Sequence, residues 1–163
     1  MPVHNPADAP RAASPLFLTE PEIRRGIELL FFGFGGLMRS VDTSLAEAGL
    51  GRAHQRALYF IARHPNLTVT ELLRLLGITK QSLSRVLGEL VARGMVETRV
   101  GDRDRRQRLV RLTKDGAALE RRLYDLLATR LANAYSNAGQ GAVGGFWAVL
   151  EGLSRHPGMP PER

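Results

Sequence analysis

Residues 68–113 read TVTELLRLLGITKQSLSRVLGELVARGMVETRVGDRDRRQRLVRLT, and they are the most informative segment of the chain. The pattern predicts a short helix, a turn, a second helix and a β-hairpin, in that order. A protein with these elements can place one helix in the major groove of DNA and the hairpin tip in the neighbouring minor groove. Most of what the sequence indicates about function follows from this segment.

The two helices are predicted at Thr70–Leu76 and Lys80–Arg93, joined by a turn of the length that a helix-turn-helix uses. Gly77 is expected to cap the first helix and Thr79 to cap the second. The second helix has an apolar stripe of Leu83, Val86, Leu87, Leu90 and Val91. Its opposite face presents Lys80, Gln81, Ser84, Arg85, Gly88 and Glu89. This face suits DNA contact, although an ordinary amphipathic helix with a solvated polar face is an equal alternative.

The predicted hairpin favours DNA contact over an ordinary solvated surface. Residues 95–100 and 107–112 alternate between apolar and polar as antiparallel strands do. Between and beside them stand Arg103, Arg105, Arg106 and Arg108, with only Asp102 and Asp104 as acidic neighbours. Cations crowded on one exposed tip repel one another, whereas the negative potential of a narrow minor groove attracts them. The alternative is a solvated, salt-bridged turn, and it explains the crowding less well.

The segments before and after residues 68–113 are predicted to be mostly helical, with irregular ends. Residues 1–18, rich in Pro and Ala over the first 15, are predicted to be a disordered leader, and residues 156–163 a flexible tail. Long helices are expected at Glu20–Ala46 and after Thr113, with a further helix at Ala53–Arg63 and an extended piece at residues 67–69. A glycine-rich break at residues 139–145 is expected before the last helix. The fold class is therefore mainly α.

Composition narrows the function. The chain of 163 residues has a net charge of +7 and no cysteine, which excludes disulfides and thiolate metal sites and favours an anionic partner. It shows no secretion signal and no apolar run of membrane-spanning length, so a soluble cytoplasmic protein without a membrane partner is expected. His4, His54, His64 and His156 lack zinc-ligand spacing. We predict no metal, no cofactor and no catalytic residue.

One glycine pattern imitates a cofactor motif. Gly139, Gly141 and Gly144 match a dinucleotide fingerprint by letter, but they follow a helix instead of a strand. We interpret them as an interhelical break.

At this point the sequence resembles the MarR family of bacterial winged-helix regulators, over roughly residues 20–155. The motifs that carry the resemblance are Glu71-Leu72, Leu76-Gly77-Ile78-Thr79, Leu90-Val91-Ala92-Arg93-Gly94-Met95-Val96, Arg103-Asp104-Arg105-Arg106 and Leu112-Thr113-Lys114-Asp115-Gly116. The wing pattern of the family falls on residues 101–106, where Gly101 replaces its first aspartate. Leu16-Phe17-Leu18, Ile27-Glu28-Leu29-Leu30-Phe31-Phe32 and Thr79-Lys80-Gln81-Ser82-Leu83 are similar to a PetP-type branch.

The resemblance implies a domain at residues 19–155 that forms a homodimer on a pseudo-palindromic operator. Its winged helix-turn-helix would be residues 52–113, and residues 19–48 and 114–155 would supply the dimerisation helices. The first and fifth helices also carry more apolar surface than a small winged domain could bury alone. The predicted partners are therefore double-stranded DNA and a second copy of the chain.

The predicted DNA contacts divide by chemistry. Gln81, Ser84 and Arg85 would read base edges, and Thr79, Lys80 and Ser82 would anchor phosphates. By resemblance, Arg106 would be the minor-groove arginine, steadied by Asp104. The full predicted set is Thr79, Lys80, Gln81, Ser82, Ser84, Arg85, Arg103, Asp104, Arg105 and Arg106.

The resemblance also implies an effector pocket for a small lipophilic or phenolic anion. Its candidate residues are Phe31, Phe34, His54, Tyr59 and Tyr124. Ordinary core packing is the competing interpretation of their helical spacing, and His54 is equally explained as a helix-end or interface histidine.

Two other functions compete with a sequence-specific regulator. A non-specific architectural or nucleoid-associated protein would use the same charges without reading bases. A small-molecule binding protein or enzyme with a vestigial winged fold would need a catalytic cluster that the sequence does not contain.

Overall fold

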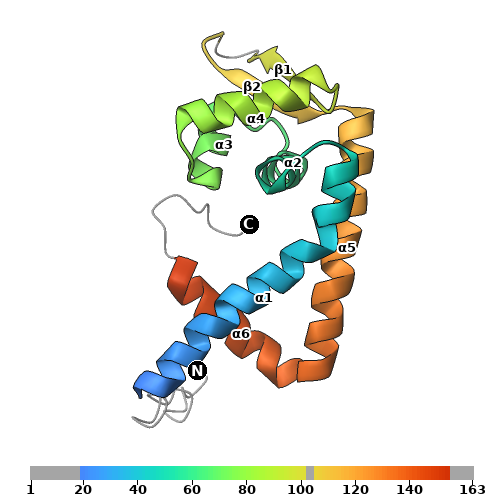
Figure 1. Ribbon diagram of the computed structural model, residues 1–163. Coiled ribbons are helices and arrows are strands. Elements are labelled where there is room, and N and C mark those ends of the chain that lie inside the picture. Colours follow the sequence, from blue (N-terminus) through green and yellow to red (C-terminus); the bar gives the residue numbers. More distant parts are fainter. Residues whose placement is uncertain (1–18, 102–104, 155–163) are drawn as a thin grey trace, which may run out of the picture. The chain divides into compact units, whose positions relative to one another are not determined.

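The computed structural model describes residues 19–101 and 105–154, so the predicted leader and tail lie outside the described residues. Its elements are α1 (Glu20–Glu47), α2 (Arg52–Arg63), α3 (Val69–Leu76), α4 (Lys80–Ala92), β1 (Val96–Val100), β2 (Arg108–Leu112), α5 (Lys114–Ala138) and α6 (Gln140–Ser154). The mainly helical fold class with a small hairpin is thereby confirmed (Figure 1). The bounds of α1 to α4 and of both strands fall within one residue of the predicted ones.

The chain divides into two compact units at Gly36–Leu37, inside the glycine-rich part of α1. The helix itself continues through this point without interruption. In the first unit, the described residues form the beginning of α1, and its large apolar side chains are exposed. They are Ile23, Ile27, Leu29, Leu30, Phe31, Phe32 and Phe34. The second unit holds the remainder of α1 and all other elements.

Local capping explains where the helices of the second unit begin. The Thr68 hydroxyl accepts a hydrogen bond from the Glu71 backbone N–H at 3.1 Å, and the Glu71 carboxylate accepts one from the Thr68 backbone N–H at 2.8 Å. These reciprocal bonds form a capping box for α3. The bond from the Thr68 backbone N–H, with a second one from its hydroxyl, holds the pKa of Glu71 below its usual range.

The predicted caps are confirmed. Thr79 accepts from the backbone N–H of Ser82 at the start of α4, and Thr113 accepts from that of Gly116 at the start of α5. Gly77 ends α3 in the left-handed conformation, with φ at 62°. Most residue types avoid this conformation, which explains a glycine at this position.

The hairpin pairs β1 with β2 in antiparallel register, from Val96 opposite Leu112 to Val100 opposite Arg108. The predicted extended piece before α3 also pairs, because Thr68 forms an isolated bridge with Leu109 and the Val110 N–H donates to the Leu67 carbonyl at 2.8 Å. The base of the hairpin is therefore tied to the chain that leads into the helix-turn-helix.

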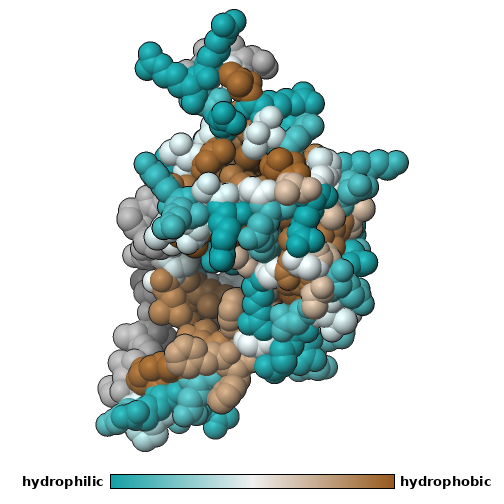
Figure 2. All heavy atoms as spheres, turned by 45° about the horizontal axis from the view of Figure 1, so that its top comes forward, coloured by the Kyte–Doolittle hydropathy of each residue, from teal (hydrophilic) through white to brown (hydrophobic). Residues whose placement is uncertain are grey.

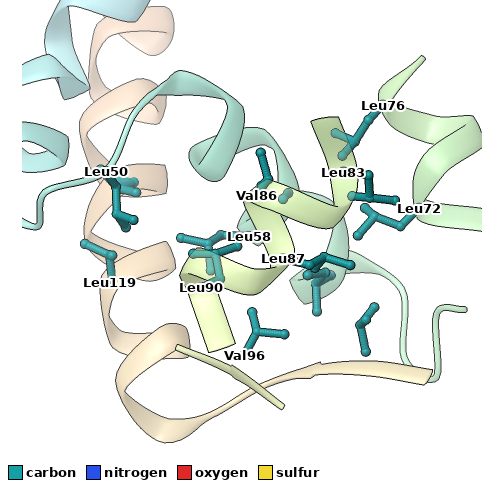
Figure 3. Packing of buried hydrophobic residues seen from close by; sticks show 14 of the residues in the cluster. Leu50, Leu58, Leu72, Leu76, Leu83, Val86, Leu87, Leu90, Val96 and Leu119 are labelled. Atoms are coloured by element: carbon teal, nitrogen blue, oxygen red, sulfur yellow. The ribbon is translucent and has the colours of Figure 1, made fainter. Parts of the chain in front are cut away.

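A shared aliphatic core holds α2, α3, α4, the base of the hairpin and the start of α5 together (Figure 3). Its buried members include Leu58, Leu72, Leu76, Leu83, Val86, Leu87, Leu90, Val96, Val110, Leu119 and Leu123. The predicted stripe of α4 was wrong at Val91, whose side chain is 43% exposed. Val91 lies one turn after Leu87, at the edge of the face that carries Leu83, Leu87 and Leu90, and the elements packed against α4 leave this edge partly uncovered.

The predicted glycine-rich break is much shorter than expected. Gly139 alone separates α5 from α6, at a φ of 83°, and α6 begins at Gln140. The interpretation of residues 139–145 as a break was therefore wrong beyond the first glycine. A helix tolerates Gly141, Gly144 and Gly145 at a cost of about 1 kcal/mol each, which neighbouring residues can offset.

The turn between α5 and α6 is lined by aromatic side chains. The Trp147 indole N–H donates to the Tyr135 hydroxyl at 2.8 Å, and both Phe146 and Trp147 pack edge-on against the Tyr135 ring. No residue of α6, all of which the structure describes, is buried. Its exposed apolar side chains include Phe146, Trp147, Val149 and Leu153.

Candidate nucleic-acid interface

Helix α4 presents a continuous polar face because its apolar face is fully used. Leu83, Val86, Leu87 and Leu90 are buried in the core, and the residues between them are turned outward. Lys80, Gln81, Ser82, Ser84 and Arg85 are all exposed. Gly88 lies on the same exposed side, and a Cβ placed there would meet no atom within 4 Å. The helix can therefore approach a flat or grooved surface closely.

The beginning of α4 combines hydroxyls with unpaired helical N–H groups. The Thr79 hydroxyl accepts from the Ser82 N–H and donates to the Ser82 hydroxyl at 2.9 Å, so both side chains are held at the helix start. Lys80 is exposed beside them. The N-terminus of a helix attracts anions through its free N–H groups and its dipole. The three predicted phosphate contacts thus lie together at a place that favours phosphate.

Arg85 is one of three linked side chains that connect α4 to α2. Its Nε lies 3.9 Å from Oε1 of Glu89, one helical turn further along. The other oxygen of Glu89 lies 2.8 Å from Nε2 of His54 on α2. Sequence reasoning placed Glu89 on the exposed face without a role, and it did not connect His54 with α4. The spacing of Arg85 and Glu89 could have indicated their pairing, whereas no local signal indicates His54.

The hairpin tip places arginines in solvent at the far end of the two strands. Arg105, Arg106 and Arg108 are exposed, and hydrophilic side chains gather there (Figure 2). The Gly101 N–H donates to the Gln107 carbonyl at 2.9 Å and closes the turn beyond the last ladder pair. Arg103 and Asp104 of the predicted set, with Asp102, lie outside the described residues.

The hairpin is tied to the rest of the domain at its base, the end of the strands away from the tip. Near the tip-distal end of β2, Arg111 donates to the Asn66 side-chain oxygen at 2.6 Å. At the junction with α5, the Thr113 hydroxyl donates to the Gly94 carbonyl at 2.6 Å. A Cβ on Gly116 would lie 1.9 Å from the Met95 carbonyl oxygen, so only glycine allows α5 to start this close to β1. These contacts fix the direction in which the hairpin projects.

Comparison with known proteins agrees with this geometry. A profile of the MarR family matches residues 48–107. The HTH-type transcriptional regulator PetP of Rhodobacter capsulatus is 49% identical over 145 residues, which cover 89% of this chain and 87% of PetP. The chain belongs to the MarR family.

Two solved structures show the same fold. A MarR-family transcriptional regulator from Silicibacter pomeroyi has a TM-score of 0.69 at 21% identity, covering 87% of this chain and 97% of that one. A mutant MarR from E. coli, crystallised with operator DNA, has a TM-score of 0.66 at 25% identity, covering 85% and 98%. This MarR-family chain is accordingly a winged-helix transcriptional regulator.

The predicted effector residues lie on three helices. Phe31 and Phe34 are exposed in the first unit. In the second unit, Tyr59 packs edge-on against Phe60, and Tyr124 is exposed beneath the Arg121 guanidinium. His54 is already hydrogen-bonded to Glu89. A shallow apolar pocket in this unit is lined by other residues, namely Ala48, Met95, Ala118, Leu119 and Arg122. The effector pocket stays a prediction.

Two kinds of feature are absent from residues 19–101 and 105–154. Within these ranges no group of three or more His, Cys, Asp or Glu side chains could hold a metal ion. Within the same ranges, no helix combines the length and apolar character needed to span a bilayer.

Proposed function

We propose that this MarR-family regulator is a homodimer that binds a pseudo-palindromic DNA operator in a sequence-specific manner. The observation that carries the proposal is the exposed polar face of α4, bounded by a phosphate-favouring helix start and flanked by an arginine-bearing hairpin. A single element of this kind would suit any anion. The combination suits the two grooves of a duplex, since a helix fits the major groove and arginines favour the narrow minor groove.

Each predicted contact has a role in this proposal. Gln81, Ser84 and Arg85 read base edges, because amide and guanidinium groups can bind adenine and guanine through paired hydrogen bonds. Thr79, Lys80 and Ser82 hold phosphates at the start of α4. Arg105 and Arg106 enter the minor groove, and Arg103 and Asp104 complete the predicted set of contact residues. The E. coli relative was crystallised in complex with operator DNA, which supports duplex DNA as the ligand of this fold.

The dimer is supported by apolar surface that one chain leaves exposed. In the first unit, Phe31 and Phe32 are 73% and 72% exposed. In α6, Trp147 and Leu153 are exposed as well. Exposed apolar surface of this kind, in either unit, is a common mark of a protein interface. A second copy of the chain would cover it and would supply the second α4 that a two-fold symmetric site requires.

The proposal includes an effector, a lipophilic or phenolic anion that changes operator affinity. Its support is membership of the MarR family, and its candidate residues stay those predicted from the sequence, namely Phe31, Phe34, His54, Tyr59 and Tyr124. A ligand that binds one conformation better shifts the equilibrium toward it, so operator affinity would depend on ligand concentration.

The test is selection of bound fragments from random DNA, followed by competition. A regulator enriches a two-fold symmetric sequence, and a large excess of random DNA leaves that complex intact. An architectural protein enriches no sequence and is removed by the excess, because its binding rests on phosphates alone. Repeating the selection with phenolic acids tests the effector. Binding by a monomer, or no enrichment, overturns the proposal.

A further inference from the structure

His54, Glu89 and Arg85 form a chain of contacts that joins the start of α2 to the exposed face of α4. We infer that Glu89, held in place by His54, positions the Arg85 guanidinium for base reading and keeps it away from phosphates. His54 and Glu89 are then specificity-determining residues that act through Arg85. The inference rests on the proposed function, because it assigns a role within DNA recognition.

The backbone N–H of Gly51 determines which ring nitrogen of His54 carries the proton. The Gly51 N–H points at Nδ1 of the imidazole ring at 3.0 Å, and an N–H can only donate. Nδ1 must therefore be the unprotonated acceptor, which leaves the proton of the neutral ring on Nε2. That proton points at Oε2 of Glu89, 2.8 Å away. The side chain of His54 is only 12% exposed, so surrounding atoms hold the ring in this orientation.

Glu89 is consequently restrained at one oxygen and available at the other. Its Oε2 is held by α2, while Oε1 faces the Nε of Arg85 at 3.9 Å. Arg85 is 79% exposed, and apart from this pairing its long side chain has solvent around it. An ordinary i,i+4 pair at such exposure contributes little to stability. The contact with His54 distinguishes this pair from an ordinary one. Because His54 of α2 fixes the Glu89 carboxylate, the position that attracts the Arg85 guanidinium is also fixed.

This arrangement favours specific over non-specific binding in two ways. By attracting the Arg85 guanidinium, the Glu89 carboxylate weakens the contact of that arginine with the phosphates of any sequence. A restrained arginine loses less side-chain entropy when it meets a matching base edge. Discrimination, the ratio of operator to random-DNA affinity, should thus exceed what Arg85 alone would supply.

Two substitutions at His54 separate its two hydrogen bonds. Asn is a shorter side chain whose oxygen can take the place of Nδ1 at Gly51, but it has no group at the position of Nε2. Gln is longer and carries an N–H₂ donor at the distance of Nε2. His54→Asn should lower discrimination by about tenfold, while His54→Gln should restore most of it. If His54 served stability alone, both variants would lower the melting temperature and leave discrimination unchanged.

Glu89→Gln removes the charge and keeps the shape. We expect stronger binding to random DNA, a steeper salt dependence and discrimination lower by about tenfold. Asp125→Asn is the matched control, because Asp125 forms the same kind of i,i+4 pair with Arg121 on α5. It should leave discrimination at the wild-type value.

The deciding measurement compares the discrimination of the Arg85→Ala variant with that of a double variant that also carries Glu89→Gln. If Glu89 acts through Arg85, the Glu89→Gln substitution has no further effect on discrimination once Arg85 is replaced by Ala. A further loss would show that Glu89 contacts a base itself and would overturn the inference. Failure of the proposed function looks different, since the wild type would then select no sequence. If the wild type selects an operator and Glu89→Gln leaves discrimination unchanged, the inference is wrong while the proposed function stands.

Discussion

In the winged helix-turn-helix, apolar side chains from α2, α3, α4 and the hairpin meet and are buried, whereas in α6 they remain at the surface. Leu58, Leu72 and Leu90 have no exposed area, while Trp147 and Leu153 of α6 are 53% and 65% exposed. Both regions are helical and rich in apolar residues, so composition does not separate them. The difference is that the winged part closes its own core, and α6 needs another surface to cover it.

The same contrast exists within α1. Met38, Val41 and Leu45 are buried in the second unit, whereas the large apolar residues of the first unit are exposed. One helix thus contributes to the core of the chain at one end and offers uncovered apolar surface at the other. Four substitutions, taken from the largest expected effect to the smallest, test whether the covered and uncovered surfaces have the roles assigned to them.

The largest effect is expected in the core. Leu90→Ala should lower the free energy of unfolding by about 2–5 kcal/mol, because it leaves a cavity at a fully buried position. Urea denaturation followed by circular dichroism measures this change. Val91→Ala is the matched control, since the neighbouring side chain is 43% exposed and should cost less than about 1 kcal/mol. Equal losses would mean that the assigned core face of α4 is wrong.

The next effect concerns the uncovered surface of α1. Phe32→Asp should leave the secondary structure intact and weaken self-association by about 3 kcal/mol or more, since each of two copies would bury a charge in place of a phenyl ring. Sedimentation velocity over a range of concentrations measures the dimer. Phe32→Leu keeps the apolar character and serves as the control. A dimer of unchanged affinity would show that this face is not part of the interface.

The third effect concerns the hairpin tip. Arg106→Ala should weaken operator binding by about 1–3 kcal/mol, the range of a good specific contact. Fluorescence anisotropy with a labelled operator measures the affinity. Arg130→Ala removes an equally exposed arginine from α5 and controls for net charge. If both variants lose the same amount, the tip contributes charge only and makes no particular contact.

The smallest effect concerns the cap of α3. Glu71→Gln should cost about 0.5–2 kcal/mol at neutral pH, the range for loss of a capping contact. Bonding to Thr68 lowers the pKa of Glu71, so the stabilisation is complete above the unfolded-state pKa of about 4.3 and is lost as the pH falls through the folded value. Thermal melts of both proteins should therefore converge in acid. A constant difference down to about pH 3 would contradict this account.

Much of the winged domain was predictable because its signals are local. Thr79 and Thr113 bond to N–H groups three residues away, and Gly77 satisfies a backbone angle that its own position requires. Such features depend on a few adjacent residues and can therefore be predicted from the sequence without knowledge of the fold. The capping box of Thr68 and Glu71 has the same local spacing, although it was not predicted. The polar face of α4 followed from helical periodicity.

Other features depend on how elements pack. Val91 lies beside a buried leucine in sequence, and only the direction of neighbouring helices shows that it faces solvent. The start of α6 at Gln140 was obscured by glycines that propensity alone assigns to a break. The contact between His54 and Glu89 joins residues 35 positions apart.

The order of elements, their caps and the exposed polar face of α4 were therefore set by the sequence alone, because backbone hydrogen bonding and side-chain periodicity act over three or four residues. Tertiary structure alone decided which apolar side chains are covered and that His54 of α2 contacts Glu89 of α4. Those outcomes depend on the distance and angle between helices, which result from the packing of the whole core.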